Sequence, residues 1–189
     1  MIIKELLKEK NMSVYRLAKE SGIPYTTVND ICSGRAQLEK CSAETVYKIA
    51  DTLNVSMEEL LEPYLLPRSS FENFKSSVCH QVKSAGDIQF IIDTLESRKI
   101  QNYYRLRWYA ECFYLLAMLD YLSRENNIPL CQDFDDLRKC KLEKTIYPAG
   151  LLAYSAVSEN KNILKEAEKN AIPEFIRFNI VENEVRNVV

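Results

Sequence analysis

Apolar residues recur three and four positions apart along most of this 189-residue chain, which is the spacing of one face of an α-helix. Over the first sixty or so residues the pattern predicts five short helices joined by tight turns. They are expected to begin near residues 3, 14, 24, 42 and 57. Ser13 and Ser56 are placed to cap helix N-termini, and Gly22 suits the left-handed residue that ends a helix.

The same spacing continues through the second part of the chain. It predicts helices over about 70–84, 88–95, 106–124, 151–157 and 163–169, and a short helix that Asp133 caps and that runs to Lys139. The segment 106–124 is apolar on nearly every side, which is typical of a buried central helix. The tail over 172–189 fits either a helix or a terminal strand.

Two prolines suggest where the chain divides. Pro63 and Pro67 bracket a boundary in the pattern, since proline seldom continues a helix. We therefore expect one domain over 1–63, a linker over 64–69 and a helical domain over 70–189.

The composition supports a mainly α fold. The chain has only 4 Gly and 6 Pro, fewer turn residues than a β-rich protein usually needs. The net charge is −2 for the whole chain, and it is also −2 over residues 1–62, with eight basic and ten acidic residues. Binding to a polyanion by bulk attraction alone is therefore not expected. The longest apolar run, Cys112 to Leu119, is far shorter than the ~20 residues of a membrane span.

Cysteine usage indicates a reducing compartment. The 6 Cys are scattered, none lies in a C-x-x-C pair, and a single His is available as a further metal ligand. Lys4 and Glu5 interrupt the start of the chain before an apolar stretch forms, so no signal peptide is expected. These features predict a cytoplasmic protein with neither disulfides nor a metal site.

The most informative stretch is residues 13–35. Leu17 and Ala18 are expected to hold the second predicted helix against the third, with Gly22 making a sharp turn between them. Val28 and Ile31 anchor the third helix from behind. The residues left on its outward side are Tyr25, Thr26, Thr27, Asn29 and Asp30. A short helix held at a fixed angle in this way fits the major groove of DNA.

This stretch resembles the XRE, or Cro/C1-type, helix-turn-helix family of repressors. The Leu17-Ala18, Gly22-Ile23 and Val28…Ile31…Gly34 elements match at the family's spacing, and residues 43–61 match its last two helices. The resemblance covers about residues 1–63 and implies a five-helix, lambda-repressor-like DNA-binding domain.

The resemblance also implies a role for each matching residue. Tyr25, Thr26, Thr27 and Asn29 would face base edges, while Ser13, Val14, Arg35 and Lys40 would meet phosphates. Two positions depart from the family. Val14 replaces a residue that is often polar, and Asp30 repels phosphate unless it accepts a hydrogen bond from cytosine. A helical bundle that binds protein instead of DNA is the alternative for this domain.

Other candidates favour structural roles. His80 lacks companion metal ligands. We expect Asp133, Asp135 and Asp136 to stabilise a helix N-terminus rather than to bind a cation. The aromatic group Tyr103, Tyr104, Trp108, Tyr109, Phe113 and Tyr114 is expected in the core, with a ligand or partner surface as the alternative. The mostly basic run from Arg138 to Lys144 is expected on a solvated face. No phosphate-binding loop or nucleophile motif is present, so neither a cofactor nor a catalytic site is expected.

The sequence thus predicts a transcriptional regulator with no enzymatic activity. One recognition helix rarely gives enough specificity, so we expect a homodimer that represses from a palindromic operator in double-stranded DNA. Residues 70–189 would then dimerise, sense a ligand or bind a partner. The alternatives are an antitoxin that neutralises a toxin protein through this region and represses its own operon, and an enzyme within residues 70–189.

Overall fold

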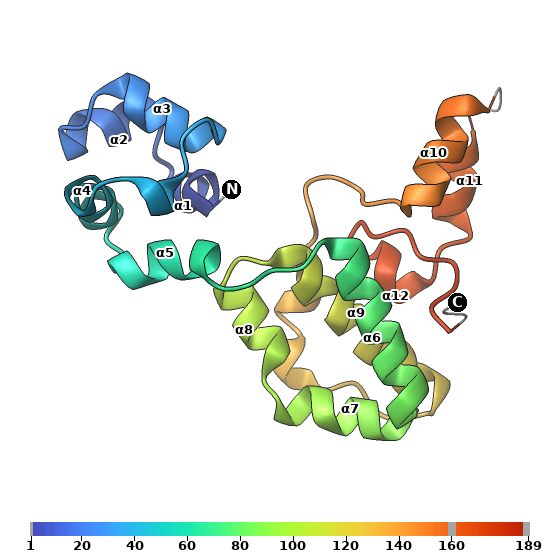
Figure 1. Ribbon diagram of the computed structural model, residues 1–189. Helices are drawn as coiled ribbons and strands as arrows, with labels where there is room; N and C mark the ends of the chain where they lie inside the picture. The colour runs from blue at the N-terminus through green and yellow to red at the C-terminus, as the bar shows by residue number, and fades with distance from the viewer. Residues whose placement is uncertain (1, 159–161, 187–189) are drawn as a thin grey trace. The chain divides into compact units, whose positions relative to one another are not determined.

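The computed structural model describes residues 2–158 and 162–186, and this part of the chain is mainly helical, which confirms the predicted fold class (Figure 1). The described residues form no β-strand, although Ile146 and Ile180 pair as an isolated parallel bridge. The chain divides into two compact units, Met1–Arg68 and Ser69–Val189.

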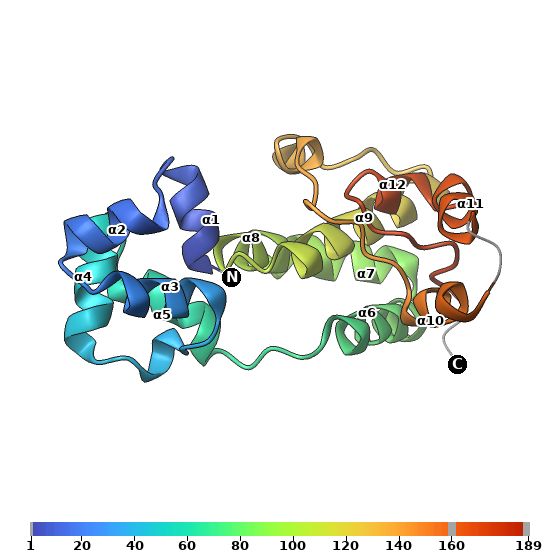
Figure 2. The same cartoon turned by 90° about the horizontal axis from the view of Figure 1, so that it is seen from above.

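The N-terminal unit contains the five predicted helices (Figure 2). They are α1 (Ile2–Glu9), α2 (Val14–Ser21), α3 (Tyr25–Ser33), α4 (Ala43–Leu53) and α5 (Met57–Leu65), with a 3₁₀ turn, η1 (Leu38–Lys40), before α4. Ser13, Ser42 and Ser56 each accept a hydrogen bond from the backbone N–H three residues ahead, which starts α2, α4 and α5. The inward faces of all five helices meet in one apolar core.

Helix α5 runs past the proline at which the sequence pattern placed a boundary. Pro63 lies inside the helix, which ends at Leu65. Proline removes one backbone hydrogen bond from a helix, but this ring is buried against the rest of the unit. Its packing therefore offsets the lost bond, which a rule based on local sequence does not anticipate.

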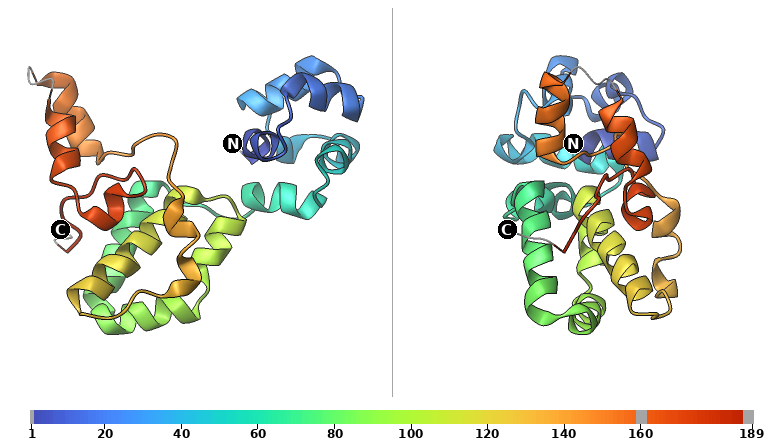
Figure 3. Two further views of the ribbon diagram at one scale, coloured as in Figure 1. Left: turned by 180° about the vertical axis from the view of Figure 1, so that it is seen from behind. Right: turned by 90° about the vertical axis from the view of Figure 1, so that its right-hand side faces the viewer.

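The C-terminal unit is built around one buried helix, α9 (Tyr109–Glu125), as the apolar pattern predicted (Figure 3). Helices α6 (Phe71–Ala85), α7 (Asp87–Glu96), α8 (Lys99–Arg105) and α12 (Pro173–Ile176) all contact it. The remaining elements are the 3₁₀ turns η2 (Gln132–Phe134) and η3 (Leu137–Lys139) and the helices α10 (Ala149–Val157) and α11 (Ile163–Lys169). None of the described helices has the length and apolar content needed to cross a bilayer.

The predicted helix over 106–124 begins three residues too early. Arg107 adopts a left-handed backbone with φ 58°, which separates α8 from α9. Leu106 and Trp108 on either side are buried, so packing of these two side chains holds the turn in place. Helical spacing continues across this turn, and for that reason the sequence pattern could not detect it.

The predicted aromatic group mainly forms core. Tyr114 is fully buried, with its ring 5.0 Å from that of Phe175, and the Phe113 ring stacks on Phe178 at 5.0 Å. The Tyr103 ring stacks on Trp108 at 5.9 Å. Tyr104 is the group's most exposed member, at 39%. These contacts join α8 and α9 to residues near the C-terminus, which favours the structural interpretation.

The prediction of a helix from Asp133 to Lys139 was wrong. This segment forms two separate 3₁₀ turns, and Asp133 lies within the first of them instead of capping a helix. The basic run does not lie wholly on a solvated face either. The Arg138 side chain is only 10% exposed and makes two hydrogen bonds, of 2.8 and 2.9 Å, to the buried carboxylate of Asp120 on α9. This buried ion pair holds the irregular segment against the core.

The C-terminal tail is neither the helix nor the strand that the sequence allowed. Over residues 172–186 the only helix is the four-residue α12, and Asn179 with φ 61° turns the chain after it. Phe178, Ile180 and Val181 are nonetheless buried. Their apolar spacing therefore reflects core contacts made by irregular backbone. Residues 187–189 of the predicted element lie outside the described residues.

Candidate nucleic-acid interface

A rigid frame of apolar side chains holds α3 against α2. Leu17 and Ala18 on α2 are buried against the inward face of α3, formed by Val28, Ile31 and Cys32. Burial raises the pKa of the Cys32 thiol, which therefore stays neutral and packs as a small apolar group. The sharp turn between the two helices uses Gly22, whose φ of 68° is costly for other residues.

The opposite face of α3 carries the residues expected to contact bases. Tyr25 is 50% exposed, Thr26 is exposed, and Thr27, Asn29 and Asp30 are half-buried. All five side chains belong to the first two turns of a nine-residue helix. A helix of this kind can present its N-terminal residues to base edges in the major groove.

The N-terminus of α2 carries two of the residues expected at phosphate. The Ser13 hydroxyl accepts a hydrogen bond of 3.1 Å from the Arg16 N–H, so this side chain already serves its own helix. Val14 is half-buried against the core. A phosphate at this position would therefore accept hydrogen bonds from the backbone N–H groups of the first turn of α2 rather than from either side chain.

Arg35 and Asp30 form an ion pair that the sequence did not reveal. The Arg35 guanidinium lies 2.6 Å from the Asp30 carboxylate, while the side chains remain 65% and 43% exposed. The acid on α3 is thus paired with a base from the same unit. Lys40, the other predicted phosphate contact, is exposed and has no ion-pair partner within residues 2–158 and 162–186.

Two exposed residues extend this face beyond the predicted set. Tyr15 on α2 is 68% exposed and its ring lies 6.4 Å from that of Tyr25. Ser33 is exposed at the end of α3, on the face that carries Thr26 and Asp30. The signal for Tyr15 was a large aromatic residue at an outward position of the second predicted helix.

Substituting Asp30 tests whether this ion pair restrains DNA binding. Asp30→Asn removes a negative charge from α3 and ends the competition between Asp30 and phosphate for the Arg35 guanidinium. We therefore expect tighter binding to any duplex and a steeper slope of log K against log salt. Gel-shift titrations at several salt concentrations measure both. Asp51→Asn, an equal charge change at an exposed site on α4, is the control. Weaker binding to all duplexes would contradict the assignment.

The other candidate residues do not converge on a chemical site. His80 is exposed on α6, whereas Cys79 beside it is buried against Tyr114. Asp135 pairs with Arg138, and Asp136 pairs with Lys139. Within the described ranges, no group of three or more His, Cys, Asp or Glu side chains is placed to hold a metal ion.

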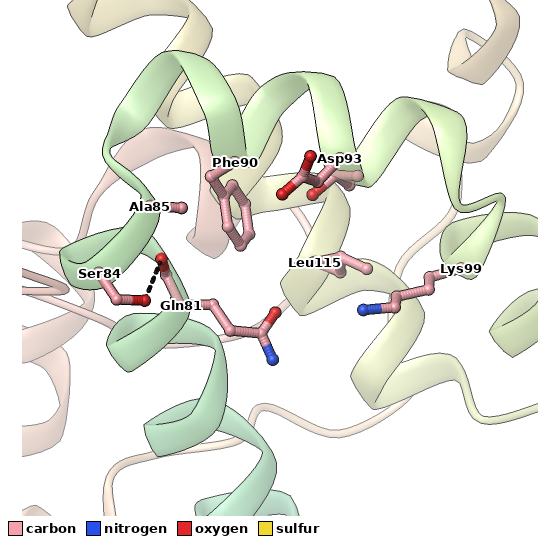
Figure 4. Close-up of a pocket in the computed structure, with 8 residues that line it drawn as sticks. Gln81, Ser84, Ala85, Phe90, Asp93, Lys99 and Leu115 are labelled. Atoms are coloured by element: carbon pink, nitrogen blue, oxygen red, sulfur yellow. Dashed lines mark hydrogen bonds between the residues drawn. The ribbon is translucent and has the colours of Figure 1, made fainter.

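A pocket of about 290 Å³ opens between α6, α7, α8 and α9 of the C-terminal unit (Figure 4). Its polar groups come from Gln81, Ser84, Asp93, Thr94 and Lys99, around the apolar Phe90, Ala85 and Leu115. Gln89 holds the Asp93 carboxylate at 2.7 Å, and the Ser84 hydroxyl donates to the Gln81 backbone carbonyl at 3.2 Å. The side chains that line this pocket thus include one carboxylate, one hydroxyl already bonded to the backbone, and the Lys99 amine.

Comparison with known proteins identifies the N-terminal unit. Residues 3–64 match a family model described as a Cro/C1-type HTH DNA-binding domain. The fold and the exposed face of α3 thus belong to a DNA-binding domain of this type, which supports a DNA-binding transcriptional regulator as the class of protein. Searches of curated proteins and of solved structures gave no match. The family match lies wholly within the N-terminal unit.

Proposed function

We propose that the protein is a cytoplasmic, sequence-specific repressor that binds a palindromic operator as a homodimer. The observation that carries the proposal is the outward face of α3, held by a buried frame inside a domain that matches a DNA-binding family. Two such helices, one turn of DNA apart, would read two half-sites. The C-terminal unit would then pair the two copies.

The side chains on this face suggest a division of roles. Asn29 suits adenine, whose major-groove edge offers one donor and one acceptor, and the methyl group of Thr26 suits a thymine methyl. Lys40 and the Arg35 guanidinium suit phosphates, which position the domain without reading sequence. Tyr15 and Tyr25 together form an exposed aromatic edge beside the start of α3.

Alanine substitutions separate the two roles. Thr26→Ala and Asn29→Ala should each weaken operator binding by ~1–3 kcal/mol while leaving binding to random duplex nearly unchanged. Arg35→Ala should weaken binding to all duplexes alike and flatten the salt dependence. Lys83→Ala, which removes one exposed positive charge from α6, is the matched control. Operator binding that is unchanged in all three variants would refute this assignment of the site.

Footprinting on the DNA upstream of the protein's own gene is the first experiment. We expect one protected palindrome that random competitor DNA does not remove. Protection of every sequence to the same extent would exclude a specific repressor. An adjacent reading frame that is toxic alone and tolerated with this protein would instead favour the antitoxin alternative, which uses the same N-terminal domain and differs in what the C-terminal unit binds.

A further inference from the structure

The pocket in the C-terminal unit combines an apolar surface with a polar rim (Figure 4). Phe90 and Leu115 are buried, at 3% exposed each, and supply the apolar surface. The exposed side chains of Gln81, Asp93 and Lys99 supply an amide, a carboxylate and an amine. Figure 4 shows the Lys99 amine and the Gln81 amide pointing toward each other across the pocket. A volume of about 290 Å³ is at the lower end of the range for ligand sites, so the pocket suits a small molecule.

Two opposite charges line this pocket without forming an ion pair. Lys99, at the start of α8, has no ion-pair or hydrogen-bond partner within residues 2–158 and 162–186. Asp93, on α7, accepts a hydrogen bond of 2.7 Å from the Gln89 side chain through Oδ1, which leaves Oδ2 for another donor. Covering an unmatched charge costs free energy, so a ligand that lies over both residues has to bring a charge of the opposite sign to each.

The pocket also contains a buried hydroxyl. Thr94 on α7 is 5% exposed and lines the pocket. Its hydroxyl forms no hydrogen bond with the rest of the described chain, whereas the Ser84 hydroxyl donates to a backbone carbonyl of its own helix. Buried polar groups nearly always have a hydrogen-bond partner. The Thr94 hydroxyl therefore points to a polar group on the molecule that the pocket holds.

We propose that this pocket binds a small zwitterion, namely a free amino acid with an apolar side chain. The ligand's carboxylate pairs with Lys99, and its ammonium group pairs with Asp93. Its side chain packs on Phe90 and Leu115, and its polar end hydrogen-bonds to Thr94. An inorganic anion or a simple amine is a poorer fit, because each leaves one of the two charges unmatched. The site lies within the C-terminal unit alone and goes beyond the proposed repressor function.

Isothermal titration calorimetry of the full-length chain tests the proposal. L-valine, L-leucine and L-methionine are the probes, and the one that binds most tightly is then compared with its amide and its N-acetyl derivative. The amide lacks the carboxylate, and the N-acetyl derivative lacks the ammonium charge. We expect saturable binding of the amino acid and affinities that are about three- to tenfold weaker for each derivative, the range between an exposed ion pair and a charge-assisted hydrogen bond.

Charge variants assign each end of the ligand. Lys99→Gln should weaken binding of the amino acid about three- to tenfold and leave the affinity for the amide nearly unchanged, because the amide has no carboxylate for the amine to bind. Asp93→Asn should likewise weaken the amino acid and spare the N-acetyl derivative. Lys83→Gln on α6 and Glu96→Gln on α7 make equal charge changes at exposed sites outside the pocket. These two controls should change the affinity by less than about twofold.

Three outcomes would overturn the proposal. The first is no binding heat from any of the three amino acids up to about 10 mM. The second is equal affinity for the amino acid, its amide and its N-acetyl derivative, since an apolar cavity that ignores charge would give that result. The third is unchanged affinity in both Lys99→Gln and Asp93→Asn, which would place the ligand elsewhere. Both side chains are exposed, so the variants are expected to fold, and circular dichroism checks that they do.

Discussion

Replacing Leu17 with alanine is expected to weaken DNA binding strongly by destabilising the N-terminal unit while the C-terminal unit stays folded. Leu17 lies on α2 and is completely buried. Helix α2 contacts α3 and α4. Truncating a buried leucine costs ~2–5 kcal/mol. A unit of this size has a stability of only about 5 kcal/mol or slightly more, so the loss takes most of it.

The single tryptophan makes this prediction easy to measure. Trp108 lies buried in the C-terminal unit, so its fluorescence reports the unfolding of that unit alone, whereas circular dichroism reports both units. Leu17→Ala should lower the first transition seen by dichroism and leave the tryptophan transition in place. Leu65→Ala, at a position 66% exposed, is the matched control and should change neither. Retention of full operator affinity by Leu17→Ala at 37 °C would contradict the argument.

Replacing Asp120 with alanine should destabilise the C-terminal unit by about 3–5 kcal/mol. Asp120 is 1% exposed and accepts from Arg138 at 2.8 Å and from Arg177 at 3.3 Å. Removing the carboxylate leaves the Arg138 guanidinium buried without its main counter-charge. The cost of that uncompensated charge exceeds what the ion pair itself contributes to stability.

Denaturant titration followed by Trp108 fluorescence measures this effect. Asp136→Ala, whose side chain is 94% exposed, is the control and should shift the midpoint little. The double variant Asp120→Leu with Arg138→Met should be more stable than Asp120→Ala, because it leaves neither charge behind. If the double variant is as unstable as the single one, lost packing rather than buried charge is the cause.

The sequence predicted most of the helices and the outward residues of α3 on the candidate DNA-binding face, but not Tyr15, Ser33 or the pairing of Arg35 with Asp30. Five helices in residues 1–65 and a buried α9 follow from apolar spacing. A helix at the surface of a unit has one apolar stripe, whereas a helix at its centre is apolar on all sides. The start of α9, the 3₁₀ turns after Cys131 and the irregular tail did not follow. These depend on single left-handed residues and on contacts with distant parts of the chain.

The amino-acid sequence by itself determined which side of α3 is buried, since Val28 and Ile31 lie at helical spacing and leave Thr26 and Asp30 opposite them. Only the tertiary structure decided how charges pair. It placed Arg35 on Asp30 around the turn after α3, and it brought Arg138 and Arg177 to the buried Asp120. The physical reason is that a buried helix face repeats apolar residues at a regular spacing, which the sequence displays. An ion pair depends on where the fold places two single side chains, and no repeating pattern records that.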